Sequence, residues 1–111
     1  MKIFITGVAG FLGSHLADLM ISQGHTVAGN DNMIGGYTDN VPQDVEFHQV
    51  DCCDLENLTK AMEGCDIVYH TAATAYEGLS VFSPVLVTRN IFEASVTTIT
   101  AAIRNKVKRI V

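Results

Sequence analysis

Residues 3–13, Ile3-Phe4-Ile5-Thr6-Gly7-Val8-Ala9-Gly10-Phe11-Leu12-Gly13, decide the fold of this chain. A short apolar run leads into three glycines spaced three residues apart, and a helical pattern follows. This order predicts a buried strand, a tight turn with few side chains, and a helix. Such a turn lets the backbone approach a phosphate closely, and the helix start adds unpaired N–H groups and a positive dipole end. The stretch therefore predicts a nucleotide-diphosphate site, with the alternative that the glycines serve only tight packing.

The composition describes one globular domain, residues 1–111, with a single modest core. Hydrophobic residues make up 48% of the chain and charged residues 17%, which excludes a disordered chain. The net charge of −5 argues against a nucleic-acid partner. The one basic cluster, Lys106, Lys108 and Arg109, is typical of a solvated junction between a helix and a strand.

The sequence predicts neither a membrane span nor an export signal. Apolar runs are broken by Gly, Thr, His or Asp before they reach spanning length, and the apolar stretch after Lys2 leads directly into a patterned helix. The three cysteines, Cys52, Cys53 and Cys65, form neither a metal-binding spacing nor an even disulfide set. They are typical of small buried residues in a reducing compartment, so we expect a cytoplasmic protein without a metal site.

Strand and helix patterns alternate along the chain. Helices are expected over residues 11–23 and 84–104, and a shorter one between Asp54 as its N-cap and Gly64 at its end. Residues with loop composition fill the connections. Strands are expected over residues 2–6, 25–30, 45–50, 66–73 and 107–111, and loops over residues 32–43 and 74–83.

This alternation predicts an α/β fold built from βαβ units, with one parallel sheet. Right-handed crossovers and a reversal after the first three strands give a doubly wound sheet of strand order 3-2-1-4-5. Such a sheet binds ligands beyond the carboxyl ends of its strands. The glycine turn, Asp31, Asp51 and Thr71 all follow expected strands, so they are expected at one edge.

The helix expected over residues 84–104 starts at Ser83 and Pro84, a favourable N-cap and first helical residue. Its weakest part is residues 96–100, where β-branched residues lower helix propensity. Two apolar stripes run along it, more than a monomer normally exposes. We therefore expect a homodimer that packs through this helix. The stripes are Val85, Phe92, Val96, Ile99 and Ile103, and Val87, Ile91, Ala94 and Ala102.

Asp31 stands after the second expected strand, eighteen residues beyond Gly13. A dinucleotide site places an acidic residue near this position to accept both ribose hydroxyls. Its charge repels a 2′-phosphate, so NAD is favoured over NADP as the cofactor. The alternative is an ordinary loop aspartate. If the site is real, substituting Asp31 is expected to weaken NAD binding without lowering stability.

Two further strand ends carry candidate site residues. Asp51 can accept a hydrogen bond from an adenine amino group, and the backbone of Cys52 beside it can supplement that contact. Thr71, Ala72 and Ala73 are small and leave room for a flat ligand. His70, which precedes them, is expected to be a structural residue hydrogen-bonded near the sheet rather than a catalytic one.

Together these motifs resemble the extended short-chain dehydrogenases. More narrowly, they are similar to the NAD-dependent nucleotide-sugar epimerases and dehydratases. The resemblance rests on Thr6-Gly7-x-x-Gly10-x-x-Gly13, Asp31-Asn32, Val50-Asp51, and residues 66–73, and it extends through the last residues, 107–111. It implies a Rossmann-type fold and a dimer packed through the helix over residues 84–104.

The resemblance also implies contacts between the chain and NAD. The pyrophosphate would lie on the glycine turn, the adenosine ribose and the adenine at the next two strand ends, and the path toward the nicotinamide at the fourth. The pyrophosphate would contact Gly7, Gly10, Phe11 and Leu12, and the adenosine ribose would contact Asp31 and Asn32. The adenine would contact Asp51 and Cys52, and the path toward the nicotinamide would be lined by Thr71, Ala72 and Ala73. Gly13 would let the helix pack on the sheet.

Two departures from the family pattern stand out. The family commonly has an Asn four residues before a Thr or Ser in the helix after the fourth strand, and Asn90 lies one place too early relative to Ser95. The family also uses a Tyr-x-x-x-Lys pair, in which the Lys lowers the pKa of the tyrosine. No residue here fills that role, since Tyr37, Tyr69 and Tyr76 are followed at that spacing by Val41, Ala73 and Ser80.

The sequence thus predicts the N-terminal, NAD-binding part of a nucleotide-sugar epimerase or dehydratase. The parent reaction would be a transient hydride transfer from a sugar carbon to NAD. With no catalytic residue identified, we expect the chain alone to be inactive and to be a truncation of a longer enzyme with a nucleotide-sugar substrate. The alternatives are a separate NAD-sensing or regulatory module, and an α/β interaction domain whose glycines only pack.

Overall fold

The computed structural model describes residues 1–74 and 77–111. Its centre is one parallel sheet with the strand order β3-β2-β1-β4-β5, which confirms the predicted topology. The expected strands all form, although several are shorter than predicted. They are β1 (Lys2–Thr6), β2 (Thr26–Asn30), β3 (Val45–His48), β4 (Ile67–His70) and β5 (Arg109–Ile110).

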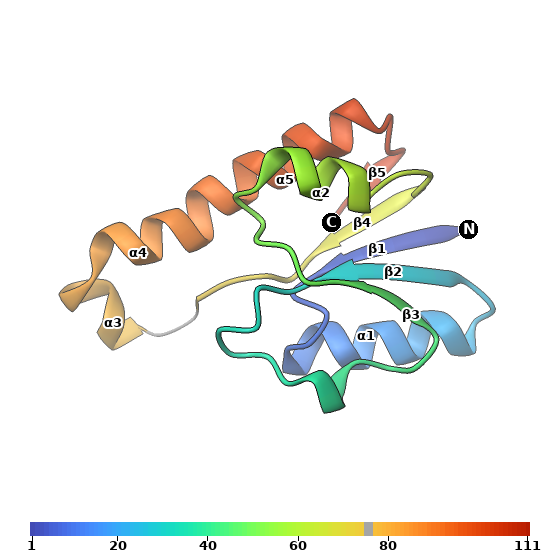
Figure 1. Ribbon diagram of the computed structural model, residues 1–111, viewed down its shortest axis with the longest axis horizontal. Coiled ribbons are helices and arrows are strands. Elements are labelled where there is room, and N and C mark those ends of the chain that lie inside the picture. The colour runs from blue at the N-terminus through green and yellow to red at the C-terminus, as the bar shows by residue number, and fades with distance from the viewer. Residues whose placement is uncertain (75–76) are drawn as a thin grey trace.

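Helices cover both faces of this sheet. Figure 1 shows α1 (Phe11–Ser22) on one face and α2 (Leu55–Ala61) with α5 (Ala94–Arg104) on the other. α3 (Glu77–Phe82) and α4 (Pro84–Thr88) extend beyond the carboxyl edge of the sheet. A π-helical turn, Arg89–Glu93, joins α4 to α5, and a short 3-10 turn, Thr38–Asn40, lies between β2 and β3.

The predicted helix ends are confirmed where local chemistry sets them. Asp54 caps α2, and its side chain accepts a hydrogen bond from the backbone N–H of Asn57. Gly24 and Gly64 follow α1 and α2 with φ values of +86° and +76°, which glycine adopts without strain. Ser83 and Pro84 begin α4 as predicted, but the Ser83 side chain makes no capping hydrogen bond.

The predicted fourth strand and the loop after it differ from the structure. β4 ends at His70, because hydrogen bonds to Thr6 take the place of the regular sheet hydrogen bonds beyond it. The Thr6 carbonyl accepts from the Thr71 hydroxyl, and the Thr6 hydroxyl oxygen accepts from the backbone N–H of Ala72. The loop expected over residues 74–83 contains α3, whose last turn is closed by Ser83 N–H donating to the Leu79 carbonyl. Residues 75–76, within that loop and including Tyr76, lie outside the described residues.

The predicted long helix persists through its weakest stretch. Within α5 the buried Thr98 donates its hydroxyl to the Ala94 carbonyl, and Thr100 donates to Val96, so these side chains have local partners. The departure from regular geometry lies earlier, at the π-helical turn Arg89–Glu93.

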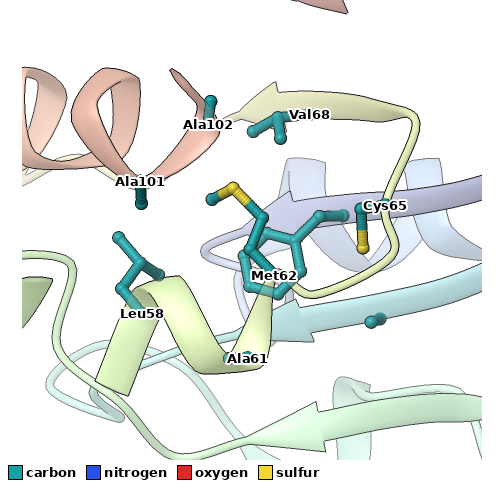
Figure 2. Close-up of a cluster of buried hydrophobic side chains, with 9 residues drawn as sticks. Leu58, Ala61, Met62, Cys65, Val68, Ala101 and Ala102 are labelled. Carbon is teal, nitrogen blue, oxygen red and sulfur yellow. The ribbon is translucent and has the colours of Figure 1, made fainter. Parts of the chain in front are cut away.

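The core consists of two apolar clusters, one on each face of the sheet. β1 contributes to both, because its side chains alternate: Ile3 and Ile5 pack toward α1, and Phe4 packs toward α2 and α5. Figure 2 shows the second cluster, in which Leu58 of α2 and Met62 just after it meet Ala101 and Ala102 of α5 over Val68 of β4. Burial on both faces explains the continuous apolar runs of the central strands.

Small residues hold α1 against the sheet. Its buried positions are Gly13, Ser14, Ala17 and Met20, whereas the larger Leu12 is 64% exposed. A Cβ on Gly13 would lie 2.2 Å from the Gly7 carbonyl oxygen. The close fit of the helix on the glycine turn therefore requires glycine at position 13.

Gly13→Ala should lower the free energy of unfolding by about 3 kcal/mol, because the new methyl group meets backbone atoms that cannot move aside. Chemical denaturation measures the change. Gly78→Ala is the matched control, because a Cβ there meets nothing within 4 Å and alanine favours α3, so stability should rise by up to about 1 kcal/mol. Equal small effects of both changes would contradict the packing described.

Candidate functional site

A cleft of about 460 Å³ opens at the carboxyl edge of the sheet. That volume is in the usual range for small-molecule sites. Ten of the predicted site residues line it, which brings four separate strand ends together. They are Gly7, Gly10, Phe11, Asp31, Asn32, Asp51, Cys52, Thr71, Ala72 and Ala73. Leu12 and Gly13 do not line the cleft; Leu12 lies at the exposed helix start, and Gly13 is buried beneath the turn.

The glycine turn is fastened to the end of β2. The backbone N–H groups of Gly7 and Val8 both donate to the Asn30 carbonyl, at 2.8 and 3.1 Å. Gly7 has a φ of +70°, and a Cβ there would lie 2.9 Å from the Cα of Ala72. The turn therefore needs glycine both for its conformation and for the close approach of the segment after β4.

The start of α1 presents backbone donors beside the cleft. Gly10 is its N-cap and has no side chain to cap the first N–H groups. The N–H groups of Phe11, Leu12 and Gly13 have no acceptor within the helix, because they lie in its first turn. Together with the helix dipole they form a site suited to an anion such as a pyrophosphate.

Asp31 is only 8% exposed and links two loops. Its Oδ2 accepts from the backbone N–H of Ala9 at 3.1 Å, and its Oδ1 accepts from Met33 N–H at 2.9 Å. Each carboxylate oxygen keeps a further lone pair for a ligand hydroxyl. Because Asp31 also holds the glycine turn, the expectation that its substitution leaves stability unchanged must be revised.

Asp51 and Cys52 form the neighbouring part of the cleft. The Asp51 carboxylate accepts from Cys53 N–H at 2.7 Å and lies 3.6 Å from the Arg89 guanidinium. Burial raises the pKa of Asp51, but hydrogen bonds from Cys53 and Asn32 together with the charge of Arg89 outweigh it and hold the pKa below its ordinary value. Burial raises the pKa of the Cys52 thiol, so Cys52 offers a neutral thiol and its backbone rather than a thiolate.

His70 lies in a chain of hydrogen bonds that crosses the sheet. Its Nδ1 is 2.8 Å from the Thr6 hydroxyl, and its Nε2 is 3.0 Å from the Ser95 hydroxyl. Ser95 donates its own proton to the Ile91 carbonyl, so Nε2 is the donor and Nδ1 the acceptor of a neutral imidazole. Burial lowers the pKa of His70, which favours the same neutral form. These contacts agree with the predicted structural role.

The cleft also contains residues that are not among the predicted site residues. They come from β2, the loop after it, and the helices beyond β4. They are Asn30, Ile34, Gly35, Gly36, Thr74, Leu79, Leu86, Asn90 and Ala94. Asn30, a polar residue that ends an otherwise apolar strand, was a usable signal, and its amide donates to the Val50 carbonyl at 2.8 Å.

Asn90 lines the cleft although its spacing from Ser95 differs from the family pattern. Its Nδ2 donates to the Thr74 hydroxyl at 3.0 Å.

In residues 1–74 and 77–111, no cluster of three or more His, Cys, Asp or Glu side chains could hold a metal ion. Across the same residues, no helix has both the length and the apolar character needed to span a membrane.

His70 should make stability fall as the pH drops below about 6.5. Its pKa in the folded chain is below the ordinary value of 6.5, so the unfolded chain binds more protons as the pH falls past that value. Stability is therefore fully present above pH 6.5 and declines below it. Thermal melts of the wild type and His70→Gln should show a smaller decline for the variant. An identical decline in both would contradict the neutral His70.

A comparison with protein families gives one match over nearly the whole chain. Residues 3–111 match the model of the NAD dependent epimerase/dehydratase family. Among curated proteins, the chain is 36% identical over 95 residues to Protein CapI of Staphylococcus aureus, covering 76% of this chain and 28% of that protein. It is 34% identical over 84 residues to UDP-glucose 4-epimerase of Corynebacterium glutamicum, covering 76% and 26%.

Solved structures give a similar result. The structure of Thermotoga maritima UDP-glucose 4-epimerase with UDP-glucose superposes with a TM-score of 0.95 at 29% identity, over 99% of this chain and 36% of that one. The Thermus thermophilus UDP-glucose 4-epimerase complex with NAD gives a TM-score of 0.93 at 32% identity, over 99% and 36%. The chain therefore spans little more than a third of these structures, and less of the curated relatives.

Proposed function

This chain belongs to the NAD dependent epimerase/dehydratase family, and we propose that it forms the NAD-binding part of a nucleotide-sugar epimerase or dehydratase. The observation that carries the proposal is the cleft at the carboxyl edge of the sheet, which is lined by the glycine turn and by the buried Asp31 that accepts a hydrogen bond from this turn. The family and its NAD-bound relatives make NAD the cofactor.

The residues of the cleft fit NAD in chemical terms. The N–H groups of Phe11 and Leu12 would bind the pyrophosphate, and Asp31 with Asn32 would bind the adenosine ribose. Gly7 and Gly10 leave the space that a side chain would fill. Asp51 and Cys52 would hold the adenine, and Thr71, Ala72 and Ala73 would line the path toward the nicotinamide. Gly13 would let α1 pack closely against the glycine turn.

In this reaction NAD would take a hydride from a sugar carbon and later return it or pass it to further chemistry. The chain's own residues would bind and orient the dinucleotide. Relatives act on sugars such as UDP-glucose, and a nucleotide sugar is accordingly the proposed substrate of the whole protein. No tyrosine of this chain has a lysine four residues later, so we propose that residues 1–111 alone bind the cofactor without turnover.

The cytoplasm is the proposed location, because all three cysteines are free thiols.

A homodimer is the proposed assembly. Val85, Phe92, Val96, Ile99 and Ile103 of the helical segment 84–104 are all exposed apolar residues. A monomer normally exposes less contiguous apolar surface to solvent than this stripe provides.

Isothermal titration should give NAD binding that is at least tenfold tighter than NADP binding, because the Asp31 carboxylate repels a 2′-phosphate. Asp31→Ser should reduce the ratio of the two affinities. The ratio is the informative quantity, since this change also removes one hydrogen bond to the glycine turn and one to the loop after β2, and so lowers stability. A wild type that binds neither dinucleotide, or both equally, would contradict the proposed site.

Light scattering at increasing concentration should detect a dimer, and Ile99→Glu should shift it to monomer because a charge would be buried in the contact. Leu19→Glu on α1 is the matched control, since Leu19 is 49% exposed and Ile99 45%, on opposite faces of the sheet. A wild type that stays monomeric at high concentration would disprove the dimer.

A further inference from the structure

The π-helical turn Arg89–Glu93 contains Asn90 and ends just before the segment that carries Ser95. Asn90 reaches the segment after β4, and Ser95 reaches the last residue of β4. Asn90 donates to the Thr74 hydroxyl at 3.0 Å, and the Ser95 hydroxyl is 3.0 Å from His70 Nε2. In a regular α-helix, residues five positions apart point about 140° away from each other. In a π-helical turn, whose hydrogen bonds span five residues, such a pair comes onto one face.

The backbone of this turn has the hydrogen bonds that the wider geometry requires. The N–H of Ala94 reaches the Arg89 carbonyl, five residues earlier. The Arg89 carbonyl also accepts from the Cys53 thiol at 3.4 Å, and the Ile91 carbonyl accepts from the Ser95 hydroxyl at 2.6 Å. Side chains from outside and inside the helix thus add to the backbone hydrogen bond from Ala94 N–H that the Arg89 and Ile91 carbonyls both receive.

We propose that this π-helical turn sets the helix register at the cleft, and that it makes Asn90 a cofactor-binding residue while Ser95 keeps its bond to His70. The one-residue shift of Asn90 from the family pattern is compensated by the turn that follows it. Ile91, at the position where the family has its Asn, is 41% exposed and does not line the cleft.

Asn90 retains hydrogen-bonding capacity for a ligand. Its bond to Thr74 uses one N–H of the side-chain amide. Among the described residues no further hydrogen bond of the amide is found, so its second N–H and its Oδ1 can serve a hydroxyl or phosphate group of the dinucleotide. This role rests on the proposed function, because it requires NAD in the cleft.

Two measurements on the isotope-labelled chain test the proposal. Without ligand, the Asn90 side-chain amide protons should show a nuclear Overhauser effect to the Thr74 methyl group, and its absence would overturn the register. With NAD, Asn90→Ala should weaken the affinity about three- to tenfold, the loss expected for one hydrogen bond. Asn57→Ala, on the exposed surface of α2, is the control and should bind NAD like the wild type.

The double variant Asn90→Ala, Ile91→Asn separates the two helix registers. If the π-helical turn sets the register, an amide at position 91 faces away from the cleft, and the affinity stays as low as in Asn90→Ala. Restored affinity in the double variant, or wild-type affinity in Asn90→Ala, would overturn the proposal. A wild-type chain that shows the Thr74 contact but does not bind NAD would instead contradict the proposed function and the cofactor role of Asn90, and leave the register supported.

Discussion

The close approach of backbone to backbone at the glycine turn is the constraint on which the rest of this structure depends. Gly7 lies against Ala72, Gly13 lies against the Gly7 carbonyl, and the Asn30 carbonyl holds the turn with two hydrogen bonds. These contacts join β1, α1, β2 and the segment after β4 at one point. Because the turn lacks side chains, the same contacts leave room for a phosphate. Tight packing and the proposed phosphate binding are therefore compatible with one arrangement, and they are not competing explanations of the glycines.

Two polar side chains, those of Asp31 and His70, stabilise this arrangement. Asp31 ties the glycine turn to the loop after β2, and neutral His70 ties β1 and β4 to the long helix through Thr6 and Ser95. Each residue belongs to the candidate site or borders it, and each also supports the fold. A ligand that binds Asp31 consequently meets a carboxylate that is already oriented, which lowers the entropic cost of binding.

Local patterns predicted much of this structure. The strand order, the cap at Asp54 and the turn glycines Gly24 and Gly64 follow from short-range rules, and ten cleft residues follow from strand ends that a parallel sheet brings to one edge. The rest depends on contacts between distant residues. Thr6 and Thr71 end β4 early, α1 buries Ala17 instead of Leu12, and the π-helical turn returns Asn90 to the cleft. No periodicity in the sequence indicates these outcomes. The contacts of Thr71 with Thr6 and of Asn90 with Thr74 join separate segments, and the hydrogen bond from Ala94 to Arg89 departs from the regular helical period.

Binding of one dinucleotide by both the backbone N–H groups at the start of α1 and the carboxylate of Asp31 can be seen in a crystal structure of the chain grown with NAD. We expect pyrophosphate oxygens within hydrogen-bonding distance of the Phe11 and Leu12 N–H groups, and the adenosine ribose hydroxyls on Asp31. NAD bound elsewhere on the chain, or a pyrophosphate that makes no contact with the glycine turn, would contradict this binding mode.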